Sequence, residues 1–114
     1  MDNRQLDALV AQARYGRKFF AGEQLICQNT GVRYGPALHY STDIAEAMAL
    51  VEELRRGGNG KAACCIRLDI TDYPVEQDCR CTIYGPDQAE VSADGHELPE
   101  AICLAYLKAK GVDV

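Results

Sequence analysis

Apolar side chains recur at helical spacing near both ends of the chain. Asn3 can cap a first helix, which we expect to run to about Tyr15, with Gly16 ending it; its apolar stripe comprises Leu6, Leu9, Val10 and Ala13. Pro99 suits the first turn of a last helix, which Gly111 closes, and the stripe here comprises Leu98, Ala101, Ile102, Ala105 and Tyr106.

A third helix is predicted in the middle of the chain. Ser41 or Thr42 can cap it, and Asp43 then lies in the first turn, where its charge complements the helix dipole. One face of this helix carries Ile44, Ala47, Met48, Val51 and Leu54. The glycine-rich run at 57–60 stops it.

Alternation of apolar and polar residues predicts strands in four segments, at 24–28, 62–71, 78–84 and 88–92. The last three are linked as hairpins. Residues 29–40 hold glycines, a proline and no regular period, so we expect a loop there. The chain therefore predicts an α+β fold, with a mostly antiparallel sheet of about four strands and three helices packed on it.

Length and charge narrow the class of protein. A chain of 114 residues fits one domain, residues 1–114, with a core of its own. The net charge of −5 argues against general binding of nucleic acids, because such binding depends on neutralising phosphates. The longest apolar run, at 62–66, is too short to cross a membrane, and no leader pattern opens the chain, so we expect a cytoplasmic protein.

Six cysteines are present, at 27, 64, 65, 79, 81 and 103. We interpret them as reduced thiols that mostly fill the core. The alternative is a zinc or copper site, because alternation puts Cys79 and Cys81 on one side of a strand and Cys64 can join them. Thiols along the interior of a strand are more often core than ligands, so we expect no metal and no other cofactor.

The segment at 29–40 holds the candidate binding residues, which are Arg33, Tyr34, His39 and Tyr40. Arginine and tyrosine together can stack on and pair with a nucleotide or an anionic peptide, and loops carry function more often than cores do. The plainer interpretation is that any loop of this length holds such residues.

Catalysis has few candidate groups. A nucleophilic thiol or hydroxyl needs a base, and the two histidines, His39 and His96, both lie in expected loops. His39 beside Ser41 could form an anion site at a helix N-terminus. More simply, Ser41 caps the helix and His39 is a surface residue.

Three stretches carry a resemblance to a known family: Leu6-Asp7-Ala8-Leu9-Val10-Ala11; Tyr40-Ser41-Thr42-Asp43-Ile44 with Glu53-Leu54-Arg55; and Pro99-Glu100-Ala101-Ile102-Cys103 with Ala105. Together they resemble the phage ABA sandwich domain, a family of small phage and prophage proteins. The resemblance implies an α/β/α sandwich and a phage or prophage origin. It implies no activity.

Three functions therefore stay open. The leading hypothesis is a non-catalytic accessory protein that binds a host or phage protein. The second is a sponge for a small anionic, nucleotide-type signal, which needs Arg33, Tyr34 and Arg67 or Arg80 to converge, most plausibly across a homodimer. The third is a small enzyme that uses His39 or His96.

Overall fold

The computed structural model describes residues 3–56, 65–71, 78–85 and 90–112. These residues form three helices and five strands, in the order α1 (Asn3–Tyr15), β1 (Gln24–Ile26), β2 (Arg33–Pro36), α2 (Ile44–Arg56), β3 (Cys65–Thr71), β4 (Asp78–Tyr84), β5 (Glu90–Gly95) and α3 (Leu98–Ala109). No helix among them is long and apolar enough to span a membrane.

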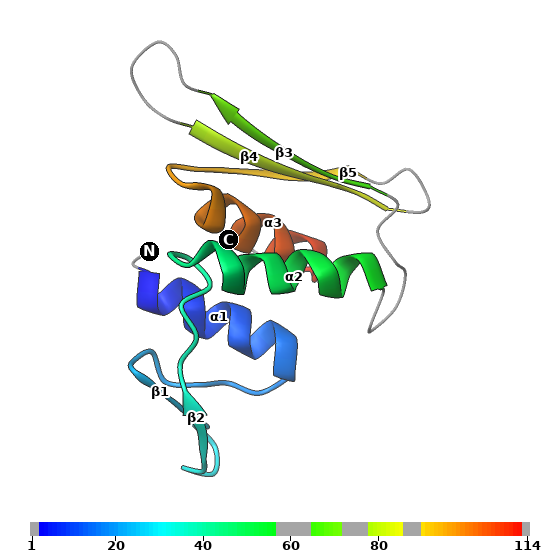
Figure 1. The fold of residues 1–114 in the computed structure, drawn as a ribbon. Coiled ribbons are helices and arrows are strands. Elements are labelled where there is room, and N and C mark those ends of the chain that lie inside the picture. Colours follow the sequence, from blue (N-terminus) through cyan, green and yellow to red (C-terminus); the bar gives the residue numbers. More distant parts are fainter. Residues whose placement is uncertain (1–2, 57–64, 72–77, 86–89, 113–114) are drawn as a thin grey trace.

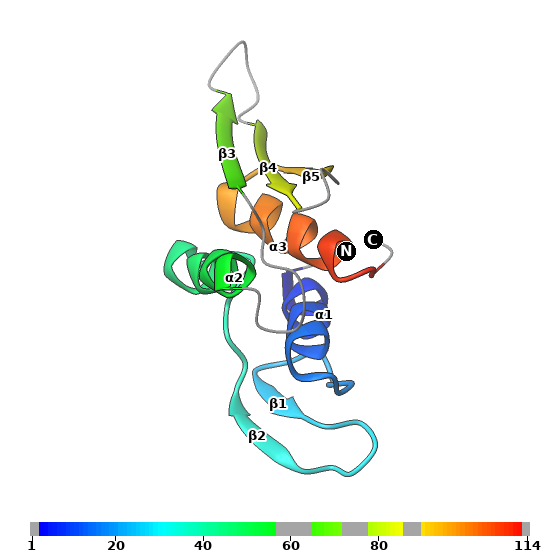
Figure 2. The ribbon, with the colours of Figure 1, turned by 90° about the vertical axis from the view of Figure 1, so that its right-hand side faces the viewer.

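The elements form successive layers, with the helices lying between two antiparallel sheets (Figures 1 and 2). The three-stranded sheet β3-β4-β5 covers one side of α3, and α1 and α2 pack against α3 from the other side. The small β1-β2 sheet lies at the opposite end of the molecule, beyond α1.

Helix α3 is the centre of the core. Seven of its residues are buried, namely Pro99, Ala101, Ile102, Cys103, Ala105, Tyr106 and Leu107. A helix that is apolar on nearly every side is stable only when other elements surround it. Gly95 lets the end of β5 approach this helix closely, because a Cβ there would lie 2.8 Å from the backbone nitrogen of Ala101.

The three-stranded sheet has one apolar face and one polar face. Cys79, Cys81 and Ile83 are buried in the same core as α3. On the other face Arg80 binds Asp94 of the neighbouring strand, with Nε 2.7 Å from Oδ1. This division is typical of antiparallel sheets, which can leave one face to water.

The predicted α+β class, the three helices and the antiparallel hairpins of the sheet are confirmed. The strands are divided between two sheets, since α1 separates the β1-β2 pair from the others. The expectation of a loop throughout 29–40 is wrong at Arg33–Pro36, which forms β2. Its short sequence shows no alternation, and its backbone pairs with β1 through a register shift beside Ile26.

The cap of α2 also differs from the prediction. The Oδ1 atom of Asp43 accepts a hydrogen bond from the backbone N–H of Ala45 at 2.9 Å, so Asp43 caps the helix in place of Ser41 or Thr42. The buried face of this helix is rotated as well. Leu50 is fully buried, whereas Ile44 is 46% exposed, because α2 meets α3 along Ala47, Leu50 and Val51.

Cys27, Cys81 and Cys103 are free thiols. Cys64, the third member of the hypothetical metal site with Cys79 and Cys81, lies outside the described residues. Within the described part of the chain, no group of three or more side chains is arranged to hold a metal ion.

Candidate binding site

Residues 16–37, which we call the arm, leave the end of α1 and include β1 and β2 (Figure 2). A small core holds the arm to α1, made of Ala11 on the helix and Phe19 and Leu25 on the arm. Backbone hydrogen bonds join its segments, among them Phe20 N to Ile26 O at 3.1 Å. The arm thus has a hydrophobic anchor separate from the main core, and its other side faces outward.

Two exposed tyrosine rings pack on the buried ring of Phe19. Phe19 makes edge-to-face contacts with Tyr34 and Tyr15, at centroid distances of 5.5 and 6.3 Å. Tyr34 is 49% exposed and Tyr15 is 51% exposed. The guanidinium of Arg17 lies over the Tyr34 ring, 5.6 Å from its centroid. We call Tyr15, Arg17, Arg33 and Tyr34 the arm surface.

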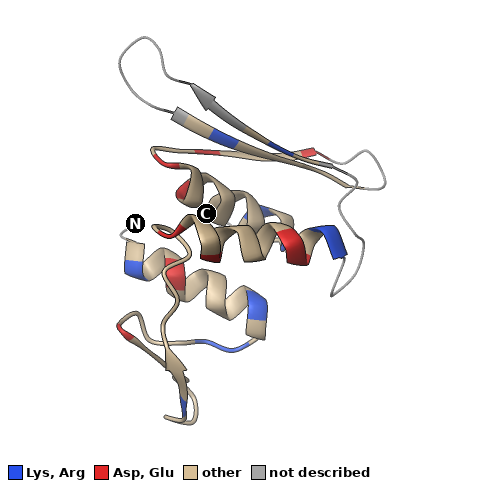
Figure 3. Cartoon of the chain, in the orientation of Figure 1, with Lys and Arg blue, Asp and Glu red and all other residues tan. Residues whose placement is uncertain are grey.

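The arm is cationic in an acidic protein (Figure 3). It carries Arg17, Lys18 and Arg33 against one acid, Glu23, while the whole chain has a net charge of −5. Glu23 pairs with Arg4 of α1 at 3.2 Å. Among the described residues, Arg17, Lys18 and Arg33 form no ion pair with any carboxylate. Their charge is therefore available to an outside partner.

A cleft of about 700 Å³ lies between the end of α1 and the turn that follows β1. Leu9 and Ala13 of α1 line it together with Val112, beyond the end of α3. The remaining lining residues come from the helix end and the arm: Gln12, Tyr15, Gly16, Arg17, Lys18, Cys27, Asn29 and Thr30. The volume lies in the range of small-molecule sites.

Cys27 lines the cleft, and the pKa of its thiol is lowered. A hydrogen bond from the Thr30 side chain lowers the pKa of this thiol, and the backbone N–H groups of Thr30 and Asn29 and the charge of Arg17 act in the same direction. Burial has the opposite effect elsewhere, since it raises the pKa of Cys81 to about 11. The thiolate is thus stabilised beside the cleft and disfavoured in the core.

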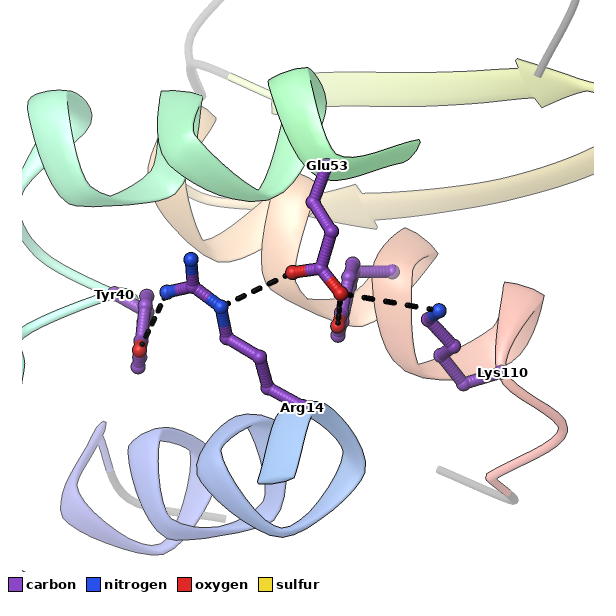
Figure 4. A network of polar contacts seen from close by, with 5 residues as sticks. Arg14, Tyr40, Glu53 and Lys110 are labelled. Atoms are coloured by element: carbon purple, nitrogen blue, oxygen red, sulfur yellow. Dashed lines mark hydrogen bonds and ion pairs between the residues drawn. The ribbon is translucent and has the colours of Figure 1, made fainter. Parts of the chain in front are cut away.

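A second polar cluster lies inside the helical layer (Figure 4). Arg14 of α1 donates a hydrogen bond from Nη1 to the Tyr40 hydroxyl at 3.0 Å, and its Nε lies 3.0 Å from Oε2 of Glu53. Tyr106 of α3 donates to Oε1 of Glu53 at 3.0 Å, and Lys110 lies 4.0 Å from the same oxygen. The cluster joins three helices, so we interpret it as structural.

The four candidate residues of the sequence are separated by the structure. Arg33 and Tyr34 are exposed on β2, and His39 is exposed in the connection to α2. Tyr40 is 1% exposed, so its interpretation as a surface contact is wrong. Its large ring is more stable inside the helical layer, where Arg14 satisfies the hydroxyl.

The other predicted groupings are not assembled within one chain. Arg80 lies on the far sheet, where it binds Asp94, while Arg33 and Tyr34 lie on the arm. His39 and His96 precede different helices, and each donates its backbone N–H to a glutamate. In the described residues neither imidazole forms a hydrogen bond or an ion pair.

Sequence reasoning missed the cleft and the role of the helix end in it. The run Tyr15-Gly16-Arg17-Lys18 was a usable signal, because it places two cations and an aromatic ring beside a helix-ending glycine. Cations at this end of a helix also complement the helix dipole, so the run by itself does not distinguish the two roles. A comparison with models of known protein families finds no match, and a comparison with curated proteins finds none either.

Proposed function

We propose that this chain is a non-catalytic binding module for a protein partner, and that the arm surface is where the partner docks. The observation that carries the proposal is that the exposed rings of Tyr15 and Tyr34 both pack on Phe19, while Arg17 lies over the Tyr34 ring. Tyrosine and arginine dominate the binding energy of protein interfaces, because they offer large, rigid contact areas with directed donors. Arg33, beside Tyr34 on β2, and His39, in the connection to α2, are also exposed, and we include both among the proposed contacts.

Charge favours an acidic partner segment. The arm carries three cations that are not engaged by the protein's own described carboxylates, whereas the chain as a whole is acidic. An acidic segment is attracted to the arm and repelled by most of the remaining surface, which orients the encounter. Partners with a basic surface would bind elsewhere or not at all.

The proposal includes the origin of the protein. We place it among phage or prophage accessory proteins of the ABA sandwich type, acting in the cytoplasm of a bacterial host. The support is that the three similar stretches fall on α1, on both ends of α2 and on α3, where they supply core residues such as Val10 and Ile102.

The test uses a fluorescent glutamate-rich peptide as the probe, with a lysine-rich peptide of equal length beside it. We expect binding of the acidic peptide alone. Arg33→Ala with Tyr34→Ala should weaken it by about tenfold or more, because both side chains are exposed contacts.

The matched control is Arg55→Ala with Arg56→Ala, which removes two exposed cations from the end of α2. This variant should bind the acidic peptide as the unaltered protein does. Equal loss in both variants would show general attraction rather than docking, and no binding of the acidic peptide would contradict the proposal.

A further inference from the structure

We infer that the cleft beside the arm is a separate site for a small aromatic anion, a molecule with one planar ring and one phosphate or carboxylate group. The cleft lies between α1 and residues 27–30, and it shares Tyr15 and Arg17 with the arm surface. Lys18 belongs to the cleft alone, and Arg33 and Tyr34 do not line it. This inference concerns a different ligand from the protein partner proposed above.

The first argument is the placement of charge. Arg17 and Lys18 both line the cleft, and among the described residues neither pairs with a carboxylate. Part of the backbone at this end of α1 already has a hydrogen-bond partner, since the Gly16 N–H donates to the Gln12 carbonyl at 2.8 Å. Two cations that line one concave site favour an anionic group there, and a guanidinium is well suited to phosphate or carboxylate.

The second argument is the apolar part of the lining. Leu9, Ala13 and Val112 supply aliphatic surface, and Tyr15, which is 51% exposed, lines the same cleft as the two cations. A planar ring can stack on tyrosine while its anionic group reaches Arg17 and Lys18. The cleft thus offers apolar surface and charged groups within one concave site, and both are features of small-molecule sites.

A neighbouring hollow provides a contrast within the same protein. It measures about 350 Å³ and lies between α1 and the arm, where Gln5, Ala8, Leu9, Gln12, Phe19, Ala21 and Gln28 line it. None of these residues carries a charge. The larger cleft thus combines the greater volume with both cations.

The test is calorimetric titration of the full chain with four probes: adenosine monophosphate, phenyl phosphate, adenosine and inorganic phosphate. We expect at least one of the two ring phosphates to bind about tenfold more tightly than either adenosine or phosphate alone, since it engages both parts of the site. Binding of inorganic phosphate as tightly as both ring phosphates would overturn the inference, and so would the failure of both ring phosphates to bind.

Variants locate the binding. Arg17→Gln and Lys18→Gln should each weaken the ring phosphate by about tenfold, while Arg33→Gln, with the same charge change on the same arm, should alter it by less than about twofold. An equal effect of Arg33→Gln would place the anion outside the cleft. Binding of the acidic peptide is tested at Arg33 and Tyr34, whereas binding of the ring phosphate is tested at Arg17 and Lys18. The two proposals can therefore fail separately.

Discussion

Asp7 of α1 accepts a hydrogen bond from the backbone N–H of Ser41 at 2.8 Å, and both residues are buried. This contact joins the first helix to the entry of α2, across more than thirty residues of chain. Ser41 adds a weaker contact, as its hydroxyl donates to the Asn3 carbonyl at 3.3 Å. The segment before α2 is therefore fixed by contacts to α1 as well as by the Asp43 cap.

Removing the Asp7 carboxylate should destabilise the fold. Asp7→Ala leaves a buried N–H without an acceptor, which costs about 1–3 kcal/mol of the free energy of unfolding. Urea unfolding followed by circular dichroism measures it. Ser41→Ala keeps the Asp7 contact and should cost less than Asp7→Ala. Equal stability of Asp7→Ala and the unaltered protein would show that this contact contributes nothing.

The cap of α2 gives a second prediction. Asp43→Ala removes the acceptor for the Ala45 N–H and should cost about 1 kcal/mol of unfolding free energy. Thr42→Ala, at the exposed neighbouring position, should stay within about 0.5 kcal/mol. Thermal or urea unfolding compares the two variants. A larger loss for Thr42→Ala would restore the cap that the sequence suggested.

Two adjacent glutamates of α2 provide a third prediction. The Glu53 side chain is 18% exposed and meets Arg14 and Tyr106, whereas that of Glu52 is 51% exposed and pairs with Arg55. Glu53→Ala leaves a partly buried guanidinium unpaired and should cost about 2 kcal/mol. Glu52→Ala should cost under about 0.5 kcal/mol. Similar losses in the two variants would mean that the cluster in Figure 4 adds no stability.

The helices were predictable because their apolar residues recur at helical spacing along the chain. The α1 bounds match the expected ones, and the stripe of the last helix reappears as buried residues of α3, such as Ala101 and Tyr106. The spacing of apolar residues predicts which side of a helix is apolar, and this information is local. It did not predict which face of α2 is buried, since that depends on where α3 lies.

The arm and its cleft could not be predicted in the same way. β2 is held by backbone pairing with β1, and its residues Arg33–Pro36 show no apolar alternation. Tyr40 was interpreted as a binding residue because it lies in the 29–40 segment. Its burial involves a contact with Arg14, which is distant in the sequence. The cleft unites the end of α1, the 27–30 turn and Val112, and only tertiary structure brings these together.

The thiols should differ in their reactivity with pH. The pKa of Cys27 lies below its usual value of 9.0, whereas burial raises the pKa of Cys81 to about 11. Because the thiolate is the nucleophile, iodoacetamide should modify Cys27 before Cys81 in the native protein below pH 9. Peptide mass spectrometry gives the order. Thr30→Ala should move the Cys27 profile to higher pH, and an unchanged profile would argue against that hydrogen bond.

Alkaline pH should destabilise the protein through Tyr40. Burial raises the pKa of this tyrosine from its usual 10.0 to about 12, so the folded state holds the phenolic proton more tightly than the unfolded state. The stabilisation is complete below pH 10 and is lost as pH rises toward 12. Tyr40→Phe removes the titrating group and should start less stable, because it also loses the Arg14 hydrogen bond.

Urea unfolding of both proteins between pH 9 and about 12 tests this linkage. The unaltered protein should lose more unfolding free energy over this range than Tyr40→Phe does. Tyr106, whose pKa is also raised by burial, remains in both proteins, so its contribution cancels in the comparison. Parallel curves would mean that Tyr40 ionises equally easily in the folded and unfolded chains, which its 1% exposure argues against.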